Sequence, residues 1–463
     1  MIEIKEELLE SLLDDAISQA KLTNKTKLIS ITKKIKKLEP LHFFESAKDL
    51  SMDRTFWTNT SETFYLVGAG SACHISAGDD RFQETERQWK KLHEAAIIHN
   101  PYKFPGTGLL AMGGMSFDPS IRKSDLWNKF EPSSFTIPKF MLTINREGYF
   151  LTTNVQVNQH DHPVQIADGI KKHEEILLSN SNNPSKGARI HSRQEIAPEQ
   201  WKDTVVRATE EIKQNEADKI VLAREMRLKF TDDATVSTIL NKLISTQANS
   251  YVFAFERDGD CFVGASPERL VKLKNKQLLS TCLAGTAPRG VSIEEDKQIA
   301  DTLLHDEKNR SEHEFVVKMI KSAMERYCKD IEIPGEPIIY PLKNLQHLYT
   351  PVTATLKSGY SIFDIIEQLH PTPALGGVPR EKSLAFIREH ERLDRGWYGA
   401  PIGWLDSNQH GEFAVAIRSG LIQGDEASLF AGCGVVRDSD PEAEYEETNI
   451  KFLPMLSVLG GYQ

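Results

Sequence analysis

Apolar and polar positions follow two different periods along the chain. Residues 219–230 (KIVLAREMRLKF) alternate, and a period of two predicts a strand with one buried face. The buried face of that strand would carry Ile220, Leu222, Met226, Leu228 and Phe230. Other apolar runs predict strands at 64–68, 139–144, 251–256 and 262–265, and a hairpin formed by 412–422 and 428–436.

Apolar residues at helical spacing separate these strands. Trp201, Val205, Ala208 and Ile212 follow Pro198 at intervals of three or four residues, which predicts a helix that begins near the proline. Similar patterns predict helices at 311–328, 361–369 and 441–459. Strands come in runs with helices interspersed, so we expect an α+β fold with large antiparallel sheets rather than strict alternation of strand and helix.

The clearest change in composition is the polar stretch 179–200, which we interpret as a surface loop or linker. It divides the chain into an N-terminal part, 1–178, and a larger part, 201–463, in which the patterns are sharper. The segment 369–381 is crowded with proline and glycine and predicts a shaped, functional loop.

Charge and cysteine content narrow the class of protein. The 463 residues carry a formal net charge of −10, which argues against broad nucleic-acid binding because that needs a basic face. The five cysteines are far apart and odd in number, so we expect reduced thiols and a cytoplasmic protein. The chain has no apolar run of transmembrane length, so we expect no membrane contact.

Acidic residues near two helix starts suggest a metal site. Glu312 shares the predicted buried stripe of its helix, and Glu444, Glu447 and Lys451 lie on one face of the last helix. Carboxylates from two helices could hold Mg²⁺ and leave positions for substrate oxygens. The alternative is a run of solvated acids.

Other residues suggest that the site grips an anion. Arg418 lies on a predicted strand face with small residues, where its guanidinium could bind a carboxylate, and Gly432 and Gly434 would expose backbone N–H groups. Lys219 shares its face with small residues and could act as a base if it were desolvated. Each of these residues alone also fits an ordinary structural role. Gly68-x-Gly70 is half of a dinucleotide motif, or simply a turn.

Nine segments between residues 200 and 460 together resemble the chorismate-utilising enzyme family. In order they are DKIVLARE, GASPERLVKL, LAGTAPRG, DEKNRSEHEFVVKMI, LQHLYTPV, LHPTPALGGVPRE, RGWYGAPIGW, FAVAIRSGLI and AGCGVVRDSDPEAEYEETNIK. The resemblance implies the chorismate-binding-enzyme fold, in which two large, mostly antiparallel sheets pack together with helices on the outside. It also implies that the N-terminal residues complete the same fold.

The resemblance assigns roles position by position. Lys219 would be the general base and Glu268 the general acid. Glu312 and Glu447 would bind Mg²⁺ directly, with Glu444 acting through water. Asn309 stands where the family has a further acidic residue, so that water-mediated contact is in doubt. The substrate chorismate would contact Gly285, Thr286, His347, Tyr398, Arg418, Gly432, Gly434 and Lys451.

Two positions distinguish the branches of this family. Lys219 indicates water as the nucleophile, and Ala284 stands where aminodeoxychorismate synthases have a nucleophilic lysine. The motifs look most like the isochorismate synthases of menaquinone biosynthesis, which need no amidotransferase subunit. A salicylate synthase, or an isochorismate synthase of a siderophore pathway, is the alternative. A catalytically silent relative that only binds a ligand is disfavoured by the intact Lys219, Glu268, Glu312 and Glu447.

Overall fold

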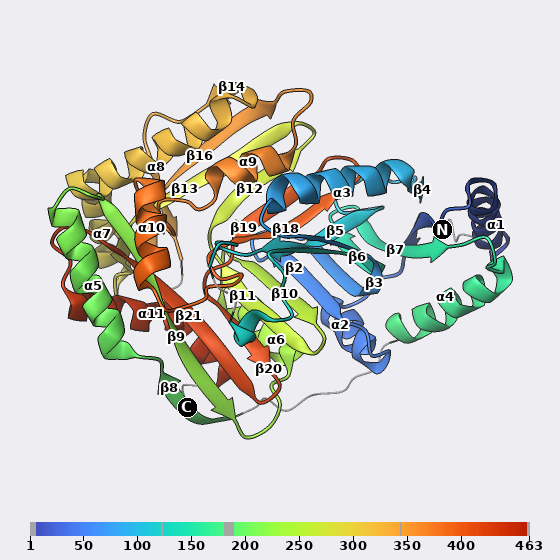
Figure 1. Ribbon diagram of the computed structural model, residues 1–463, viewed down its shortest axis with the longest axis horizontal. Helices are drawn as coiled ribbons and strands as arrows, with labels where there is room; N and C mark the ends of the chain where they lie inside the picture. The colour runs from blue at the N-terminus through green and yellow to red at the C-terminus, as the bar shows by residue number, and fades with distance from the viewer. Residues whose placement is uncertain (1–5, 122–123, 180–188, 343–344, 461–463) are drawn as a thin grey trace.

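The computed structural model describes residues 6–121, 124–179, 189–342 and 345–460. Its helices lie mainly around the outside of a large sheet (Figure 1). The helices are α1 (Glu6–Thr23), α2 (Pro40–Asp49), α3 (Arg81–Ala95), η1 (Asp125–Trp127), α4 (Pro163–Leu177), α5 (Pro198–Lys213), α6 (Val236–Thr246), α7 (Ile293–His305), α8 (Glu307–Glu325), α9 (Ile362–Leu369), α10 (Arg380–His390) and α11 (Pro441–Leu459).

The described strands join into one 21-stranded sheet, in which β1 and β4 form the only parallel pair among the described residues. Strand β6 (Ser133–Asn145) is its branch point, because it pairs with β3 on one edge and with both β5 and β7 on the other. Beyond β7 (Gly148–Val157) lie β1 (Lys27–Ile35) and β4 (Ile97–His99). From β6 the sheet continues as two arms.

The first arm runs from β3 to β9 and ends in two short strands, β8 and β17, that share the outer edge of β9. In spatial order its strands are β3 (Tyr65–Ala77), β2 (Arg54–Asn59), β10 (Tyr251–Arg257), β11 (Asp260–Ser266), β20 (Ser419–Gln423), β21 (Glu426–Val435), β9 (Lys219–Phe230), β8 (Ile190–Glu195) and β17 (Gly377–Val378).

The second arm runs from β5 to β16, and β14 and β15 share the outer edge of β16. In spatial order its strands are β5 (Leu110–Met115), β18 (Pro401–Asp406), β19 (Gly411–Val415), β12 (Arg269–Lys274), β13 (Gln277–Pro288), β16 (Leu345–Leu356), β14 (Cys328–Glu332) and β15 (Ile338–Pro341).

An aromatic-rich core fills the space between the arms. Trp57, Phe253 and Phe262 of the first arm are in one buried cluster with Met112 and Trp404 of the second. Burial of such large side chains is the main stabilising term for a sheet pair of this kind. The expected pair of packed sheets is therefore confirmed, with the added finding that strand β6 joins them.

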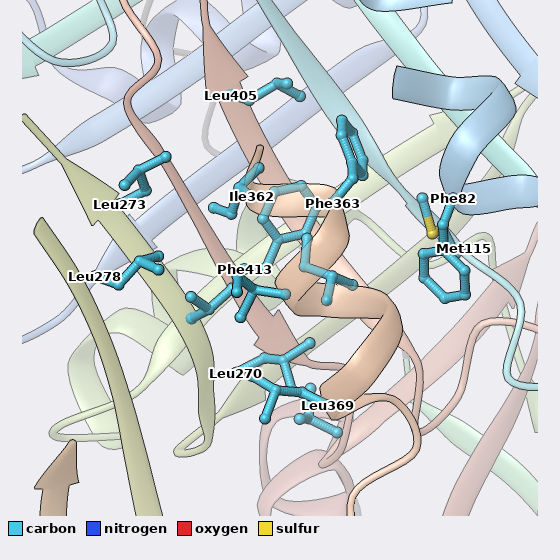
Figure 2. Close-up of a cluster of buried hydrophobic side chains, with 14 of the residues drawn as sticks. Phe82, Met115, Leu270, Leu273, Leu278, Ile362, Phe363, Leu369, Leu405 and Phe413 are labelled. Carbon is cyan, nitrogen blue, oxygen red and sulfur yellow. The ribbon is translucent and has the colours of Figure 1, made fainter. Parts of the chain in front are cut away.

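Helices cover the outer faces of both arms. Ile362, Phe363 and Leu369 of α9 pack on Leu270 and Phe413 of the second arm, and Figure 2 shows these side chains pointing toward one another. Helices α2, α6 and α11 cover the first arm, and α5 packs beside β9. Each of these helices is amphipathic: an apolar stripe packs on the sheet, and the opposite, polar face remains in water.

Most predicted elements are present. Strand β9 and helix α11 have the boundaries that the pattern predicts, 219–230 and 441–459. The loop expected at 179–200 is different: residues 180–188 lie outside the described residues, 190–195 form β8, and α5 begins at Pro198. The apolar pattern does not predict strand β8, because five of its six residues are exposed and the strand has no apolar face.

Two further expectations need correction. Gly68-x-Gly70 is neither a nucleotide loop nor a turn, because it lies inside β3, which continues to Ala77. A Cβ on Gly68 would lie 2.3 Å from the Thr55 hydroxyl, so a close neighbouring strand explains that glycine. The hairpin expected from 412–422 and 428–436 is confirmed in its second part only: β20 pairs with β21, whereas β19 ends at Val415 and belongs to the other arm.

Candidate functional site

Two of the crossings that the chain makes between the arms are short and lie next to each other, and each carries a predicted site residue. Glu268 lies between β11 of the first arm and β12 of the second. Arg418 lies between β19 of the second arm and β20 of the first, in the left-handed region with φ +54°. Hydrogen bonds tie the crossings together, because Val415 N–H donates to the Glu268 carbonyl and Ala265 N–H donates to the Arg418 carbonyl.

The crossing that carries Glu268 is held in place by the buried Ser266. The Ser266 hydroxyl donates to the Val415 carbonyl and accepts the Glu268 N–H at 3.2 Å. The Glu268 carboxyl is half-buried, and burial raises its pKa from 4.5 to about 7, against the lowering effects of the Thr372 hydroxyl and the Lys219 amine. A carboxyl group that keeps its proton near neutral pH can act as a general acid.

Lys219 is the first residue of β9, in the same neighbourhood as Glu268. Its Nζ lies 2.7 Å from Glu312 Oε1 on α8, and its side chain is 20 % exposed. A Cβ on Gly434 of β21 would lie 2.4 Å from Lys219 Cε, so that glycine leaves the room that the lysine stem occupies. The Ser383 hydroxyl donates to the Lys219 carbonyl at 2.8 Å and fixes the backbone below it.

Arg418, Tyr398 and His347 bring polar groups to the same region. No ion pair of the Arg418 guanidinium occurs within the described residues, and burial lowers its pKa, with Tyr398 and Glu447 acting in the opposite direction. Burial also raises the pKa of Tyr398, which keeps its hydroxyl protonated as a hydrogen-bond donor. The Tyr398 hydroxyl lies 3.4 Å from the point that a Cβ on Gly432 would occupy. A half-buried arginine, a phenol and two glycines suit the binding of a carboxylate.

A bulge in β13 places Gly285 and Thr286 opposite His347. Gly285 has φ +76°, and the register of β13 against β16 shifts at this residue. The Thr286 hydroxyl lies 2.9 Å from His347 Nδ1, and burial lowers the pKa of His347 to about 4, so this imidazole is neutral. The Asn309 side chain, on α8, accepts a hydrogen bond from the Thr286 N–H at 3.2 Å. Asn309 therefore has a structural contact at the position where the family is expected to have an acidic residue.

Helices α8 and α11 carry the three acidic residues predicted as metal ligands, but Glu312 does not lie on a buried stripe. Its side chain is 43 % exposed, and the buried face of α8 consists of His313, Val316, Ile320 and Met324. The helix is rotated relative to the prediction because His313 is buried, with its two ring nitrogens near the Ala284 carbonyl and the Thr350 hydroxyl. Glu312 therefore points toward Lys219 rather than into the core.

Two of the three predicted metal ligands form ion pairs with lysines. Glu312 pairs with Lys219, and Glu447 Oε1 lies 2.7 Å from Lys451, whose Nζ also donates to the Gly432 carbonyl at 2.8 Å. Glu444 Oε1 accepts the Ser439 hydroxyl, whereas its Oε2 is buried without a hydrogen-bond partner among the described residues.

The carboxylates fit a hard cation. No group of three metal-ligating side chains lies close enough to hold an ion in this arrangement of the described residues. All three predicted ligands nevertheless offer oxygen, the donor that Mg²⁺ prefers, and an unsatisfied buried carboxylate oxygen is costly unless a cation or a donor meets it. The orphaned Glu444 oxygen is thus consistent with a bound cation.

Sequence reasoning missed two residues. Thr372 lies close enough to Glu268 to lower the pKa of its carboxyl, and both residues line one small cavity of about 20 Å³. Arg395 is buried beside Tyr398 and binds several segments of the site. Thr372 and Arg395 lie in segments that carry the family resemblance, LHPTPALGGVPRE and RGWYGAPIGW. The spacing of residues in a sequence does not show which backbone atoms a side chain reaches, so these two contacts could not be predicted.

Comparisons with known proteins show which family this chain is similar to. A family model described as chorismate binding enzyme matches residues 15–460. Isochorismate synthase MenF of Bacillus subtilis is 43% identical over 453 residues, which cover 96% of this chain and 96% of that protein. The salicylate biosynthesis isochorismate synthase of Pseudomonas aeruginosa is 34% identical over 96% of this chain and 94% of that protein.

Solved structures show the same likeness in three dimensions. The menaquinone-specific isochorismate synthase MenF from Escherichia coli aligns with a TM-score of 0.78 at 25% identity, covering 97% of this chain and 100% of that chain. Anthranilate synthase component I from Streptococcus pneumoniae, at 20% identity and a TM-score of 0.70, shares the fold. No described helix is long and apolar enough to cross a membrane. With a family model that covers nearly its whole length, this chain belongs to the chorismate-binding enzyme family.

Proposed function

We propose that this protein is an isochorismate synthase, which converts chorismate reversibly to isochorismate. The observation that carries the proposal is that Lys219 lies near enough to Glu268 to act on its charge, while burial raises the pKa of Glu268 to about 7. Exchange of one allylic hydroxyl for another needs a base that activates water and an acid that protonates the departing hydroxyl. The full-length likeness to isochorismate synthases supports the same conclusion.

In the proposed reaction Lys219, in its neutral form, accepts a proton from the water that attacks C2 of chorismate. Glu268 gives its proton to the C4 hydroxyl, which leaves as water. One water enters and one leaves, so the reaction is balanced and can run in both directions. Arg418 and Tyr398, with the N–H groups of Gly432 and Gly434, would hold the enolpyruvyl carboxylate, and Lys451 would lie beside them.

The ring side of chorismate would lie against the bulge at Gly285 and Thr286, with the neutral His347 opposite. Ala284 offers no nucleophile, so we expect no covalent enzyme intermediate. Because water is the attacking group, we propose that no amidotransferase subunit is needed. The five cysteines are free, which suits a cytoplasmic enzyme. We assign the product to menaquinone biosynthesis because of the likeness to a menaquinone-specific enzyme.

Glu312 and Glu447 would bind Mg²⁺, with Glu444 near the ion through water. When bound, the ion supplies positive charge for the ring carboxylate of the dianionic substrate.

The reaction can be tested by resolving the products formed from chorismate with and without Mg²⁺. We expect isochorismate to be the only product and to form only with the ion. Starting from chorismate or from isochorismate should give the same equilibrium mixture of the two. Salicylate with pyruvate would support the salicylate synthase alternative instead. Anthranilate formed in the presence of ammonium would contradict water as the preferred nucleophile, and no turnover at all would favour a silent relative.

The metal assignment predicts that Glu447→Gln weakens Mg²⁺ binding. Loss of one anionic ligand should raise the Mg²⁺ concentration for half-maximal activity and the dissociation constant from calorimetry by at least about 10- to 100-fold, the range seen even for residues that only support a ligand. Glu446→Gln is a matched control, because Glu446 is the preceding residue on α11 and is exposed. Equal Mg²⁺ affinity in the two variants would show that Glu447 is not a ligand.

A further inference from the structure

The outer edge of β9 has a gap between its two short partner strands. Strand β17 pairs with Lys219 and Ile220, and β8 pairs with residues 226–230. Between them, residues 221–225 face no strand among the described residues. Backbone groups of a buried strand need partners, and an unpaired group costs about as much as a lost hydrogen bond. Ile196 N–H donates to the Glu225 carbonyl at the end of the gap, and three further groups of the gap are bonded by side chains.

Side chains replace the missing strand. Arg395 Nη2 donates to the Val221 carbonyl at 2.7 Å, and Glu391 Oε2 accepts the Ala223 N–H at 2.7 Å. The indole N–H of Trp201 donates to the Ala223 carbonyl at 3.1 Å. The strand that begins with Lys219 is therefore held along this edge mainly by side chains from the segment 391–395 and from α5.

Arg395 and Glu391 form one buried unit, with side chains 1 % and 3 % exposed. Two parallel hydrogen bonds, of 2.6 and 2.7 Å, join the guanidinium to the carboxylate. This bidentate geometry is specific to arginine, because the ammonium of lysine presents a single point of charge. The guanidinium also lies over the ring of Phe117, 4.3 Å from its centroid.

The same arginine reaches two other parts of the site. Its Nη1 donates to the Leu375 carbonyl at 2.9 Å, and Leu375 N–H donates to the carbonyl of Thr372, the residue beside Glu268. Its own carbonyl accepts the Tyr398 N–H at 2.8 Å. One residue thus connects three segments: its side chain joins the strand of Lys219 to the loop beside Glu268, and its backbone carbonyl holds the turn that carries Tyr398.

We propose that Arg395, oriented by Glu391, is a positioning residue that sets the distances among Lys219, Glu268 and Tyr398. It is too deeply buried to touch the substrate, so it acts through the backbone of the three segments that it joins. The kinetic part of this inference rests on the proposed isochorismate synthase activity. A misplacement of about 1 Å in a site of this kind costs on the order of 10²-fold in rate.

The test compares Arg395→Lys with Arg54→Lys. Arg54 forms an equally bidentate pair with Glu256, with side chains 8 % and 10 % exposed, on β2 and β10, which carry no residue of the proposed site. Both variants keep the positive charge but lose the two parallel hydrogen bonds that a guanidinium makes to a carboxylate, so both should lower the melting temperature. Only Arg395→Lys should lower kcat, by roughly 10²-fold. The change in KM should stay below about threefold, because Arg418 and Lys451 are untouched and Tyr398 keeps its bond to the backbone carbonyl of residue 395.

Hydrogen exchange followed by mass spectrometry makes the test independent of turnover. Arg395→Lys should speed exchange in 219–225, 371–376 and 396–400 together, whereas Arg54→Lys should leave these three segments as in the wild type. Glu391→Gln keeps an acceptor for the Ala223 N–H, so it should speed exchange in the same three segments by a smaller amount. This variant replaces Arg395→Lys in the test if Arg395→Lys does not fold.

The outcomes separate the two proposals. If Arg395→Lys lowers the melting temperature as Arg54→Lys does but keeps kcat within about threefold, the positioning role is wrong and the residue is only structural. If the wild type does not convert chorismate, the proposed function fails. The positioning role would then be decided by exchange alone: faster exchange in the three segments together would support it, and exchange confined to one segment would overturn it.

Discussion

Replacing Lys219 by alanine is expected to reduce kcat for isochorismate formation by about 10²- to 10⁴-fold, the usual contribution of a positioned base. The loss should appear in kcat rather than in binding, because the proposed contacts to both carboxylates of chorismate remain. Calorimetric titration with chorismate and Mg²⁺ should therefore give a dissociation constant close to that of the wild type. Removal of the amine also frees Glu312 from its ion pair, so metal binding should not weaken.

Lys229→Ala provides the control from the other end of the same strand. Lys229 forms exposed ion pairs with Asp425 and Glu426, and such pairs contribute little. We expect this variant to keep kcat, which would show that the loss at Lys219 does not come from general weakening of β9. Retention of kcat within tenfold in Lys219→Ala would mean that another group deprotonates the water.

Glu268→Gln is expected to reduce kcat to a similar extent, about 10²- to 10⁴-fold, because glutamine cannot release a proton to the departing hydroxyl. In the wild type, activity should fall as the pH rises above about 7, where Glu268 loses its proton, and this alkaline limb should be absent from any residual activity of the variant. A pH profile of kcat for both enzymes checks this. An unchanged alkaline limb in Glu268→Gln would assign the limb to another residue.

The same substitution should increasingly favour the folded protein as the pH rises from 4.5 to about 7. The pKa of Glu268 is raised from 4.5 to about 7 on folding, so the folded state holds this proton more tightly than the unfolded state. Its contribution to stability is present below pH 4.5 and is lost as the pH rises to about 7. Glutamine never ionises, so the melting temperature of the variant should exceed that of the wild type by an amount that grows across this window.

Much of the architecture could be predicted from the sequence because its signals are local. The alternation in 219–230 marks a strand with both boundaries, and Asp440 followed by Pro441 marks the start of α11. The helix start is visible because the Asp440 side chain accepts the N–H groups of Glu442 and Ala443, a contact that needs only neighbouring residues.

The rest depends on contacts between distant segments. Arg418 was expected on a continuous strand face, but its strand ends at Val415, where the chain leaves one arm for the other. Glu312 was expected on a buried stripe, and the burial of His313 turns it toward solvent and Lys219 instead. The bonds by which Arg395 reaches other segments end on the Val221 and Leu375 backbone carbonyls, which leave no pattern in side-chain chemistry. None of these features has a period or a spacing that a sequence could display.

The two neighbouring crossings between the arms have a consequence for how this chain can vary. The residues from Ser266 to Glu268 and from Val415 to Arg418 are hydrogen-bonded to each other, and strands of fixed register lie on both sides of each crossing. Inserting or deleting one residue at either crossing would invert the inward and outward faces of a downstream strand. It would also move the proposed proton donor relative to the guanidinium, so the lengths of these two short connections are constrained by folding and by chemistry at once.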